Sequence, residues 1–305
     1  MSPEAGAAAK RLGVLGWPVA HSRSPAMHNA ALVELGLDGW RYQRLPVPPE
    51  AFAETVRALG AAGFRGANVT IPHKEAALAL ADEASERARA IGAANTLTFL
   101  PDGRIDADNT DAPGFVAALP RPPAAGERAL VLGAGGSARA VIWALAQTGV
   151  RVRVWNRTPA RAERLAAQLG AAAVERGDEM GEADLLVNCT AVGLRSASNS
   201  FKELPLRAEE MRRYATVVDL VYRPDGTELI RAAARVGCRT VDGLEILVRQ
   251  GALSLEAWTG LPAPLERMRQ AARSRGATAS NEPARPSPPT LGGLDAAAGR
   301  GGPGT

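Results

Sequence analysis

A run of glycines at Gly133, Gly135 and Gly136 is the stretch whose residue types and spacing point most directly to chemistry. The apolar residues Leu130–Leu132 before it predict a buried strand, and the residues after it predict a helix. Glycines permit a tight turn, and a helix N-terminus offers free N–H groups and a dipole to an anion such as a pyrophosphate. The segment therefore predicts a dinucleotide-binding turn. Its expected contact residues are Gly133, Ala134, Gly135, Gly136, Ser137 and Ala138.

The end of the next expected strand, Val150–Trp155, bears on the choice of cofactor. This strand closes a βαβ unit, and in NAD-binding enzymes an acidic residue at its end usually binds the ribose 2′-hydroxyl. No Asp or Glu stands there; the residues are Asn156, Arg157, Thr158 and Arg161. Two guanidinium groups and two neutral hydrogen-bonding groups suit a 2′-phosphate, which favours NADP over NAD. The alternative is a helix cap at Asn156 or Thr158 with surface arginines, and one residue could serve in both ways.

The elements that must position these residues alternate between strands and helices, which predicts an α/β fold. In the first part, Ser24 is interpreted as the N-cap of a helix that begins with Pro25, and 72–92 as one or two helices. The segment 94–108 predicts a β-hairpin that turns at Pro101-Asp102-Gly103. Other strands of this part are expected over 12–17, 40–47 and 64–71.

A proline-rich loop at 120–127 separates this part from a second series of strands and helices, which predicts a doubly wound sheet. A helical segment follows, and from about Ser274 the composition of Gly, Ala, Pro and Ser predicts a disordered tail. The strands of the second sheet are expected over 129–132, 151–155, 185–188, 216–220 and 238–241, and its helices over 136–148, 159–169 and 226–236.

Composition excludes several classes of protein. The 305 residues are 46% hydrophobic and 22% charged, as in an ordinary globular protein of about two domains. The net charge of +4 is spread among residues of both signs, which favours solvated helix faces over a nucleic-acid patch. Cys189 and Cys238 lack the spacing of a disulfide framework or a zinc site and fit a reducing cytoplasm. The sequence shows no signal peptide and no apolar run long enough for a membrane helix. We therefore expect a cytoplasmic protein that does not bind a membrane, and we expect no metal site.

Nine short motifs, in order between residues 11 and 270, resemble the shikimate dehydrogenase family. Each motif is modest by itself, whereas the ordered set is specific. They are GWPVAHSRSPAMHNA (16–30), NVTIPHK (68–74), GAANTL (92–97), NTDAPGF (109–115), GAGGSARA (133–140), NRT (156–158), NCTAVG (188–193), DLVYRP (219–224) and QGALSLEAWTG (250–260).

The resemblance implies a domain organisation and a reaction. It implies an N-terminal α/β substrate domain over 11–111, a Rossmann-type NADP-binding domain over 112–242, and helices over 243–273 that return to the first domain; the disordered tail is 274–305. The reaction is the reversible, NADPH-dependent reduction of 3-dehydroshikimate to shikimate, in chorismate and aromatic amino acid biosynthesis. The expected protein is a monomer or homodimer with small-molecule ligands only.

The resemblance also implies which residues form the site. Lys74 and Asp111 are the implied catalytic pair, and further cofactor contacts fall on Thr190, Leu220 and Gly243. The implied substrate contacts are Ser22, Ser24, Asn68, Thr70, Lys74, Asn95, Asp111, Tyr222 and Gln250.

These residue types suit a substrate that carries one carboxylate and three hydroxyls. Ser22 and Ser24 stand two apart in a loop, so both hydroxyls could converge on the carboxylate. Asn68 and Thr70 alternate along one expected strand and so point to the same side. On an otherwise packed strand these polar residues suggest the floor of a pocket. The simpler alternatives are turn roles for Ser22 and Asn95 and a helix cap for Ser24.

Reduction of a ketone needs a hydride and a proton for the developing alkoxide. We interpret the ammonium of Lys74 as the acid and base that stabilises and protonates that oxygen, with Asp111 orienting it. Either residue alone could be a solvated lysine or a first-turn acid of a helix. Among the three histidines, His21 or His73 could instead act beside the pocket, whereas His28 is interpreted as a packing residue.

Three alternatives remain at this point, the first of them from the same class of enzyme. One is an NAD-dependent quinate/shikimate dehydrogenase. Another is a non-catalytic sensor of a shikimate-pathway ligand, which we would expect to lack Lys74 or Asp111. A dinucleotide-binding structural protein would leave the polar first half unexplained. The chain departs from the usual pattern at Ala107, where glycine is common, and at Leu194 and Ile246, where methionine is common.

Overall fold

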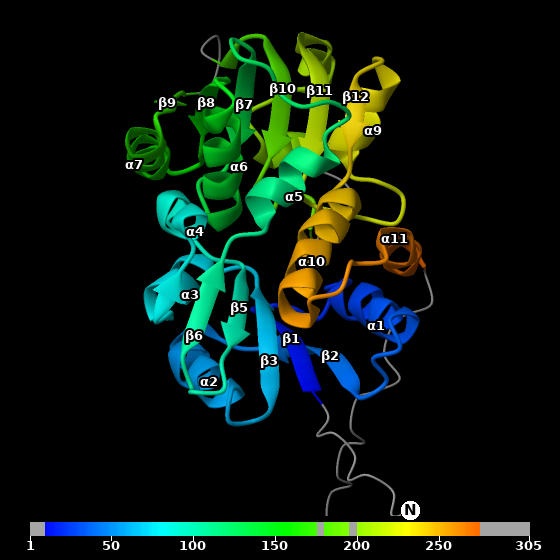
Figure 1. The fold of residues 1–305 in the computed structure, drawn as a ribbon. Coiled ribbons are helices and arrows are strands. Elements are labelled where there is room, and N and C mark those ends of the chain that lie inside the picture. The colour runs from blue at the N-terminus through cyan, green and yellow to red at the C-terminus, as the bar shows by residue number, and fades with distance from the viewer. Residues whose placement is uncertain (1–9, 176–179, 195–199, 275–305) are drawn as a thin grey trace, which may run out of the picture. The chain divides into compact units, whose positions relative to one another are not determined.

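The computed structural model describes residues 10–175, 180–194 and 200–274, and these form an α/β fold with two six-stranded sheets. The expected fold class, with two α/β parts and C-terminal helices that return to the first, is confirmed (Figure 1). The tail predicted to be disordered lies, except for Ser274, outside the described residues. No helix in the described part is long and apolar enough to cross a membrane.

The first sheet has the strand order β2-β1-β3-β5-β6-β4. Its strands β2, β1 and β3 are parallel, and β5 and β6 form the predicted antiparallel hairpin. The strands are β1 (Lys10–Gly16), β2 (Trp40–Pro46), β3 (Phe64–Val69), β4 (Glu83–Ala84), β5 (Thr96–Phe99) and β6 (Ile105–Asp108). The helices of this part are α1 (Ser24–Glu34), α2 (Phe52–Leu59), α3 (Lys74–Leu80) and α4 (Glu86–Ile91).

The second sheet is parallel, with the order β12-β11-β10-β7-β8-β9. From β7 the chain adds β8 and β9 on one side, and it then returns to add β10, β11 and β12 on the other side. The order of the strands therefore reverses between the neighbours β7 and β10. Open α/β sheets bind ligands at such switch points. The predicted doubly wound sheet is therefore present. Its strands are β7 (Arg128–Leu132), β8 (Arg151–Trp155), β9 (Ala172–Ala173), β10 (Ala183–Asn188), β11 (Tyr214–Asp219) and β12 (Arg239–Val241), and its helices are α6 (Gly136–Gln147), α7 (Pro159–Leu169), α8 (Ser200–Glu203) and α9 (Glu228–Arg235).

Three further helices complete the described fold: α5 (Asp111–Ala118) and α10 (Gly243–Thr259), which pack on each other between the two parts, and α11 (Leu265–Arg273), which packs on α1 and α10. In Figure 1, α10 lies beside α5 and extends along the first sheet. Its Trp258 packs so closely on β3 that a Cβ at Gly66 would lie 2.1 Å from the indole nitrogen, which itself donates to the Leu97 carbonyl at 3.0 Å. The glycine at position 66 is therefore what lets α10 pack against the sheet.

Some local predictions were wrong in detail. The N-cap of α1 is Arg23 without a side-chain hydrogen bond, so Ser24 is the first helical residue rather than the cap. The strand β3 ends at Val69, which places Thr70 just beyond it. Thr158 does stand at the N-cap of α7, but its side chain makes no capping bond.

His28 is buried in the core beside α10, as the packing interpretation predicts. Its ring stacks on Tyr42 with centroids 4.2 Å apart, and both ring nitrogens lie buried with no hydrogen-bond partner among the described residues. Burial lowers its pKa from 6.5 to about 3, because the apolar surroundings disfavour the charged ring. The neutral form is thus the one that this packing stabilises.

We therefore expect stability to fall as the pH drops from about 6.5 towards 3. The unfolded chain binds the His28 proton first, so this contribution is complete above pH 6.5 and is lost by roughly 1.4 kcal/mol per pH unit below it. Urea unfolding of wild type and His28→Phe across this range would measure it. The difference between the two free energies of unfolding should change with pH, whereas parallel curves would contradict the assignment.

Candidate active site

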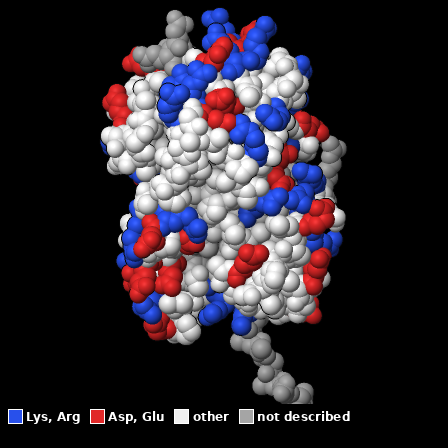
Figure 2. Space-filling model, turned by 45° about the horizontal axis from the view of Figure 1, so that its top comes forward, with Lys and Arg blue, Asp and Glu red and all other residues white. Residues whose placement is uncertain are grey.

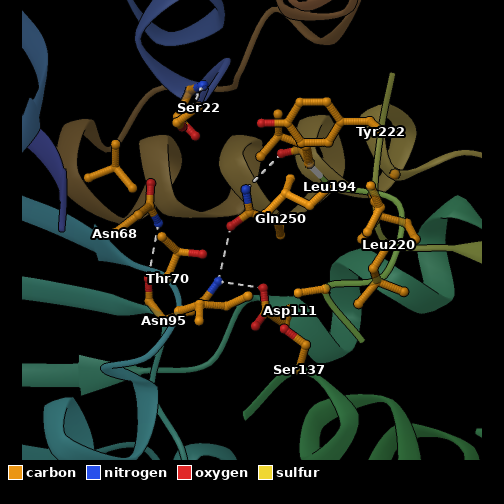
Figure 3. A pocket seen from close by; sticks show the side chains of 18 of the residues that line it. Ser22, Asn68, Thr70, Asn95, Asp111, Ser137, Leu194, Leu220, Tyr222 and Gln250 are labelled. Carbon is orange, nitrogen blue, oxygen red and sulfur yellow. Dashed lines mark hydrogen bonds between the residues drawn. The ribbon is translucent and has the colours of Figure 1, made fainter. Parts of the chain in front are cut away.

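A single pocket collects all of the predicted substrate contacts: Ser22, Ser24, Asn68, Thr70, Lys74, Asn95, Asp111, Tyr222 and Gln250. These residues come from the loop between β1 and α1, the end of β3 and the residue after it, the residue before β5, the starts of α1, α3 and α5, the segment after β11, and α10. Figure 3 shows Ser22 and Tyr222 at one end of the pocket and Asp111 and Ser137 at the other. The fold thus brings together side chains that are separated by more than two hundred residues.

Lys74 forms the centre of the polar contacts at the Asp111 end. Its Nζ donates to Asp111 Oδ2 at 2.5 Å and to Ser137 Oγ at 2.9 Å. The other oxygen of Asp111 accepts from Asn95 Nδ2 at 2.9 Å. Lys74 and Asp111 are the first residues of α3 and α5, so two helix starts hold the pair in place. An ammonium held at the wall of a polar pocket is placed to transfer a proton to a ligand oxygen.

A buried hydrogen-bond network supports this pair from below. Asn95 Nδ2 also donates to Gln250 Oε1 at 3.0 Å, and Asn68 Nδ2 donates to Ser254 Oγ at 2.8 Å. The Ser254 hydroxyl is fully buried and lies 2.9 Å from Thr96 Oγ1 and 3.1 Å from Thr110 Oγ1. A fully satisfied buried network fixes side-chain positions. Sequence reasoning missed Thr96, Thr110 and Ser254, although Ser254 follows Gln250 by four residues and so shares its helix face.

The opposite end of the pocket presents hydroxyl groups. Ser22 Oγ accepts from the Ser24 amide at 3.3 Å, and the Tyr222 hydroxyl accepts from the Arg23 amide at 3.2 Å. Burial raises the pKa of Tyr222, so its phenol remains a neutral hydrogen-bonding group. Three hydroxyls at one end of a cavity suit a carboxylate or a polyol.

The histidines separate into different surroundings. His21 lines the pocket. The suggestion that His73 lies beside the pocket is wrong: its ring stacks on Phe52 at 4.4 Å, and its Nε2 lies 2.7 Å from the Val47 carbonyl oxygen. His73 is the N-cap residue of α3, and that position turns its side chain into the core under α2 while the next residue, Lys74, faces the pocket.

The glycine turn fits a dinucleotide. Gly133 has φ +110°, a conformation that favours glycine, and its amide donates to the Trp155 carbonyl at 2.7 Å. A Cβ at Gly135 would meet nothing within 4 Å, so the turn is open on that side. The helix α6 begins at Gly136 without a side-chain cap, which leaves its first amides available to an anion. Ala138, in contrast, is buried in the core of the second sheet, where its small size serves packing.

Gly136 joins this turn to Lys74. A Cβ at position 136 would lie 2.8 Å from the Cβ of Lys74, so the lysine stem packs directly on the glycine. Together with the Lys74–Ser137 hydrogen bond, this contact places the expected cofactor turn against the Lys74–Asp111 pair. Sequence reasoning assigned Ser137 to the cofactor and missed its contact with Lys74.

The residues expected at the ribose lie beyond β8, next to the glycine turn. Arg157, Thr158 and Arg161 are exposed, and Asn156 Nδ2 donates to the Thr158 carbonyl at 3.0 Å. Two exposed guanidiniums on one turn can receive a phosphate. None of these four residues lines the pocket, and neither do the turn residues Gly133, Ala134, Gly135 and Gly136. The expected cofactor contacts that do line the pocket are Ser137, Thr190, Leu220 and Gly243.

Thr190 is held by a buried polar pair below it. Asn188 Oδ1 accepts from the Thr190 amide at 3.1 Å and from its hydroxyl at 2.7 Å. Asn188 Nδ2 in turn donates to Asp219 Oδ1 at 2.9 Å. Burial raises the pKa of Asp219 to about 6. Asn188 and Asp219 open two of the sequence motifs, and their function here is to fix the loops after β10 and β11.

Three family models match successive parts of the chain. The shikimate dehydrogenase substrate-binding domain matches residues 14–97, shikimate/quinate 5-dehydrogenase matches 118–247, and the shikimate 5′-dehydrogenase C-terminal domain matches 243–273. A curated NADP(+) shikimate dehydrogenase of Methylobacterium radiotolerans is 51% identical over 267 residues, which covers 83% of this chain and 92% of that protein. The chain belongs to the shikimate dehydrogenase family.

Solved structures of shikimate dehydrogenases agree with this assignment. The Thermus thermophilus shikimate 5-dehydrogenase, solved with NADP(H) and shikimate, has a TM-score of 0.77 and 46% sequence identity. The match covers 86% of this chain and 98% of that one. The Aquifex aeolicus enzyme has a TM-score of 0.81 and 33% identity, with 88% and 100% coverage.

The departures from the usual shikimate dehydrogenase pattern leave the polar site intact. Leu194 and Ile246 both line the pocket as apolar walls, and Ala107 is buried in β6. Each replaces a residue that supplies no charge or hydrogen bond. Leu194 and Ile246 therefore change only the shape of the apolar wall of the pocket, and Ala107 lies outside it.

Proposed function

We propose that this member of the shikimate dehydrogenase family interconverts 3-dehydroshikimate and shikimate with NADP(H), as a step in aromatic amino acid biosynthesis. The observation that carries this proposal is the Lys74–Asp111 pair at one wall of the polar pocket, against the glycine turn. When bound, NADPH supplies the hydride for reduction. Gly133–Ala138 would hold its pyrophosphate, and Asn156, Arg157, Thr158 and Arg161 its 2′-phosphate.

In this reaction Lys74 gives its proton to the oxygen of the carbonyl that is reduced. Its ammonium also stabilises the negative charge that develops on that oxygen. Asp111 holds the ammonium in place through Oδ2, and Asn95 fixes Asp111 through the other oxygen. In the direction of shikimate oxidation, Lys74 takes the proton back.

The remaining pocket residues bind and orient the substrate. We assign the carboxylate to the hydroxyls of Ser22, Ser24 and Tyr222, and the ring hydroxyls to the amides and hydroxyl at the other end. That second set is Asn68, Thr70, Asn95 and Gln250. Thr190, Leu220 and Gly243, which line the same pocket, would contact the reactive end of the cofactor.

The domain roles follow from these assignments. Residues 11–111 form the substrate domain, 112–242 the NADP-binding domain, and 243–273 return to the first domain with Gln250. We propose a cytoplasmic monomer or homodimer that needs no nucleic-acid or membrane partner. The free thiols of Cys189 and Cys238 fit a reducing compartment. In the view of Figure 2, basic and acidic side chains are interspersed rather than gathered into one basic field.

The test is a comparison of two cofactors and two substrates with the purified chain. Reduction of NADP+ and of NAD+ would be followed by absorbance, with shikimate and with quinate. The proposal expects the highest kcat/KM for shikimate with NADP+. Higher kcat/KM with NAD+ or quinate would favour the quinate/shikimate alternative, and no turnover by folded protein that binds shikimate would favour a sensor.

A further inference from the structure

The charges that line the pocket balance without a substrate. Lys74 and Asp111 are the lysine and the carboxylate among the described lining residues, and they are paired with each other. His21 also lines the pocket, and burial together with the Arg44 charge lowers its pKa, which favours the neutral ring. If the proposed function holds, the substrate adds a carboxylate at the Ser22 end. The lining residues offer that carboxylate hydroxyls but no unpaired cation.

Arg44 on β2 lies directly behind this end. It is partly buried, and its Nε and Nη2 donate to the Ser22 carbonyl at 3.2 and 2.9 Å. Within the described parts of the chain, no carboxylate forms an ion pair with it. A carbonyl group is neutral, so a partly buried guanidinium that donates its hydrogen bonds to a carbonyl has no negative charge beside it to compensate its positive charge.

The Arg44 charge acts on groups that line the pocket. Besides its effect on His21, it opposes the burial that raises the pKa of Tyr222, as does Arg23. The guanidinium of Arg23 differs in its contact, because Nη1 donates to the Ser274 carbonyl at 3.0 Å. Of the two arginines, Arg44 is therefore the one whose guanidinium is bound to the loop that carries Ser22 and Ser24.

We propose that Arg44 is a specificity-determining residue that selects a substrate bearing a carboxylate. Its charge stabilises the carboxylate at the Ser22–Ser24–Tyr222 end across the Ser22 peptide, and its two hydrogen bonds hold that peptide in place. The inference rests on the proposed function, since it takes shikimate as the ligand. Arg44 thus favours substrates that are cyclic polyols with a carboxylate over cyclic polyols that carry no charge.

Arg44→Met tests this inference, because methionine keeps most of the stem and removes the charge. We expect KM for shikimate to rise about tenfold, with kcat within about threefold and KM for NADP+ unchanged. KM for shikimate methyl ester, which carries no charge, should change little. In Arg44→Met, kcat/KM for shikimate should also depend less on the salt concentration than it does in wild type. Arg41→Met is the matched control, since exposed Arg41 lies on the same strand and its loss changes the net charge equally.

Arg44→Lys separates charge from loop geometry. Lysine keeps the charge but loses the forked donors, so we expect KM for shikimate to return to within about threefold of wild type. An equal rise of KM for acid and ester in Arg44→Met, or a shikimate KM in Arg44→Lys as high as in Arg44→Met, would overturn the inference and leave a loop-holding role. Inactive wild type would instead contradict the proposed function, whereas active wild type with unchanged Arg44→Met overturns this inference alone.

Discussion

Replacing Lys74 with methionine is expected to lower kcat for shikimate oxidation by about a thousandfold. The reason is that we propose the Lys74 ammonium, which Asp111 and Ser137 hold, as the group that exchanges a proton with the reacting oxygen. Methionine has a similar length and can still pack on Gly136, so the fold around the turn should remain. Steady-state kinetics with saturating shikimate and NADP+ measure the loss.

Two further measurements make this result specific. Lys202→Met removes an exposed lysine on α8 and should leave kcat unchanged. The Kd of Lys74→Met for NADP+ should stay within about threefold of wild type, because the lysine is assigned to proton transfer rather than cofactor binding. A kcat within tenfold of wild type in the folded variant would exclude Lys74 as the principal acid and base.

Changing Arg157 and Arg161 together to glutamine is expected to lower kcat/KM for NADP+ by roughly a hundredfold or more. Both guanidiniums are exposed beyond β8, where they can form charge-assisted hydrogen bonds to a 2′-phosphate. NAD+ lacks that phosphate, so kcat/KM for NAD+ should change by less than about threefold. The measurement is the ratio of the two kcat/KM values in wild type and in the double variant.

Arg164→Gln supplies the control for this experiment. Arg164 is exposed on α7, the helix that also carries Arg161. Its Nε donates to the Ala160 carbonyl within that helix at 3.2 Å. Its loss should leave the cofactor ratio at the wild-type value. Equal losses for NADP+ and NAD+ in the double variant would show that the two arginines support the fold of this turn and do not recognise the phosphate.

Local patterns were sufficient to predict five of the six strands of the second sheet, whereas the two-residue edge strand β9 was not predicted. The apolar strand before Gly133, the glycines themselves and the strand that ends at Trp155 lie close together in the sequence, and each specifies its own backbone. The hairpin at Pro101-Asp102-Gly103 was equally local, and Gly103 has φ +89° as that turn requires. By contrast, the pocket was predicted through the family resemblance, because its residues lie far apart in the chain.

Apart from the shifted ends of α1 and β3, the errors and omissions concern side-chain directions that tertiary packing decides. Lys74 and Ser137 are 63 residues apart in the sequence. No local pattern relates the start of α3, which packs with the first sheet, to the glycine turn of the second sheet. The burial of Ser254 among Thr96, Thr110 and Asn68 likewise depends on where α10 packs. His73 and Lys74 are adjacent in sequence but point to different environments, since one packs on Phe52 and the other lines the pocket.

The most direct test of the central claim is the stoichiometry of the reductive reaction. Purified wild-type protein would be mixed with NADPH and 3-dehydroshikimate, NADPH followed by absorbance, and the product identified by NMR. We expect one shikimate to form for each NADPH consumed, at a rate proportional to the protein concentration. No loss of NADPH with folded protein, or NADPH consumed without formation of shikimate, would contradict the assignment of this pocket as a shikimate dehydrogenase active site.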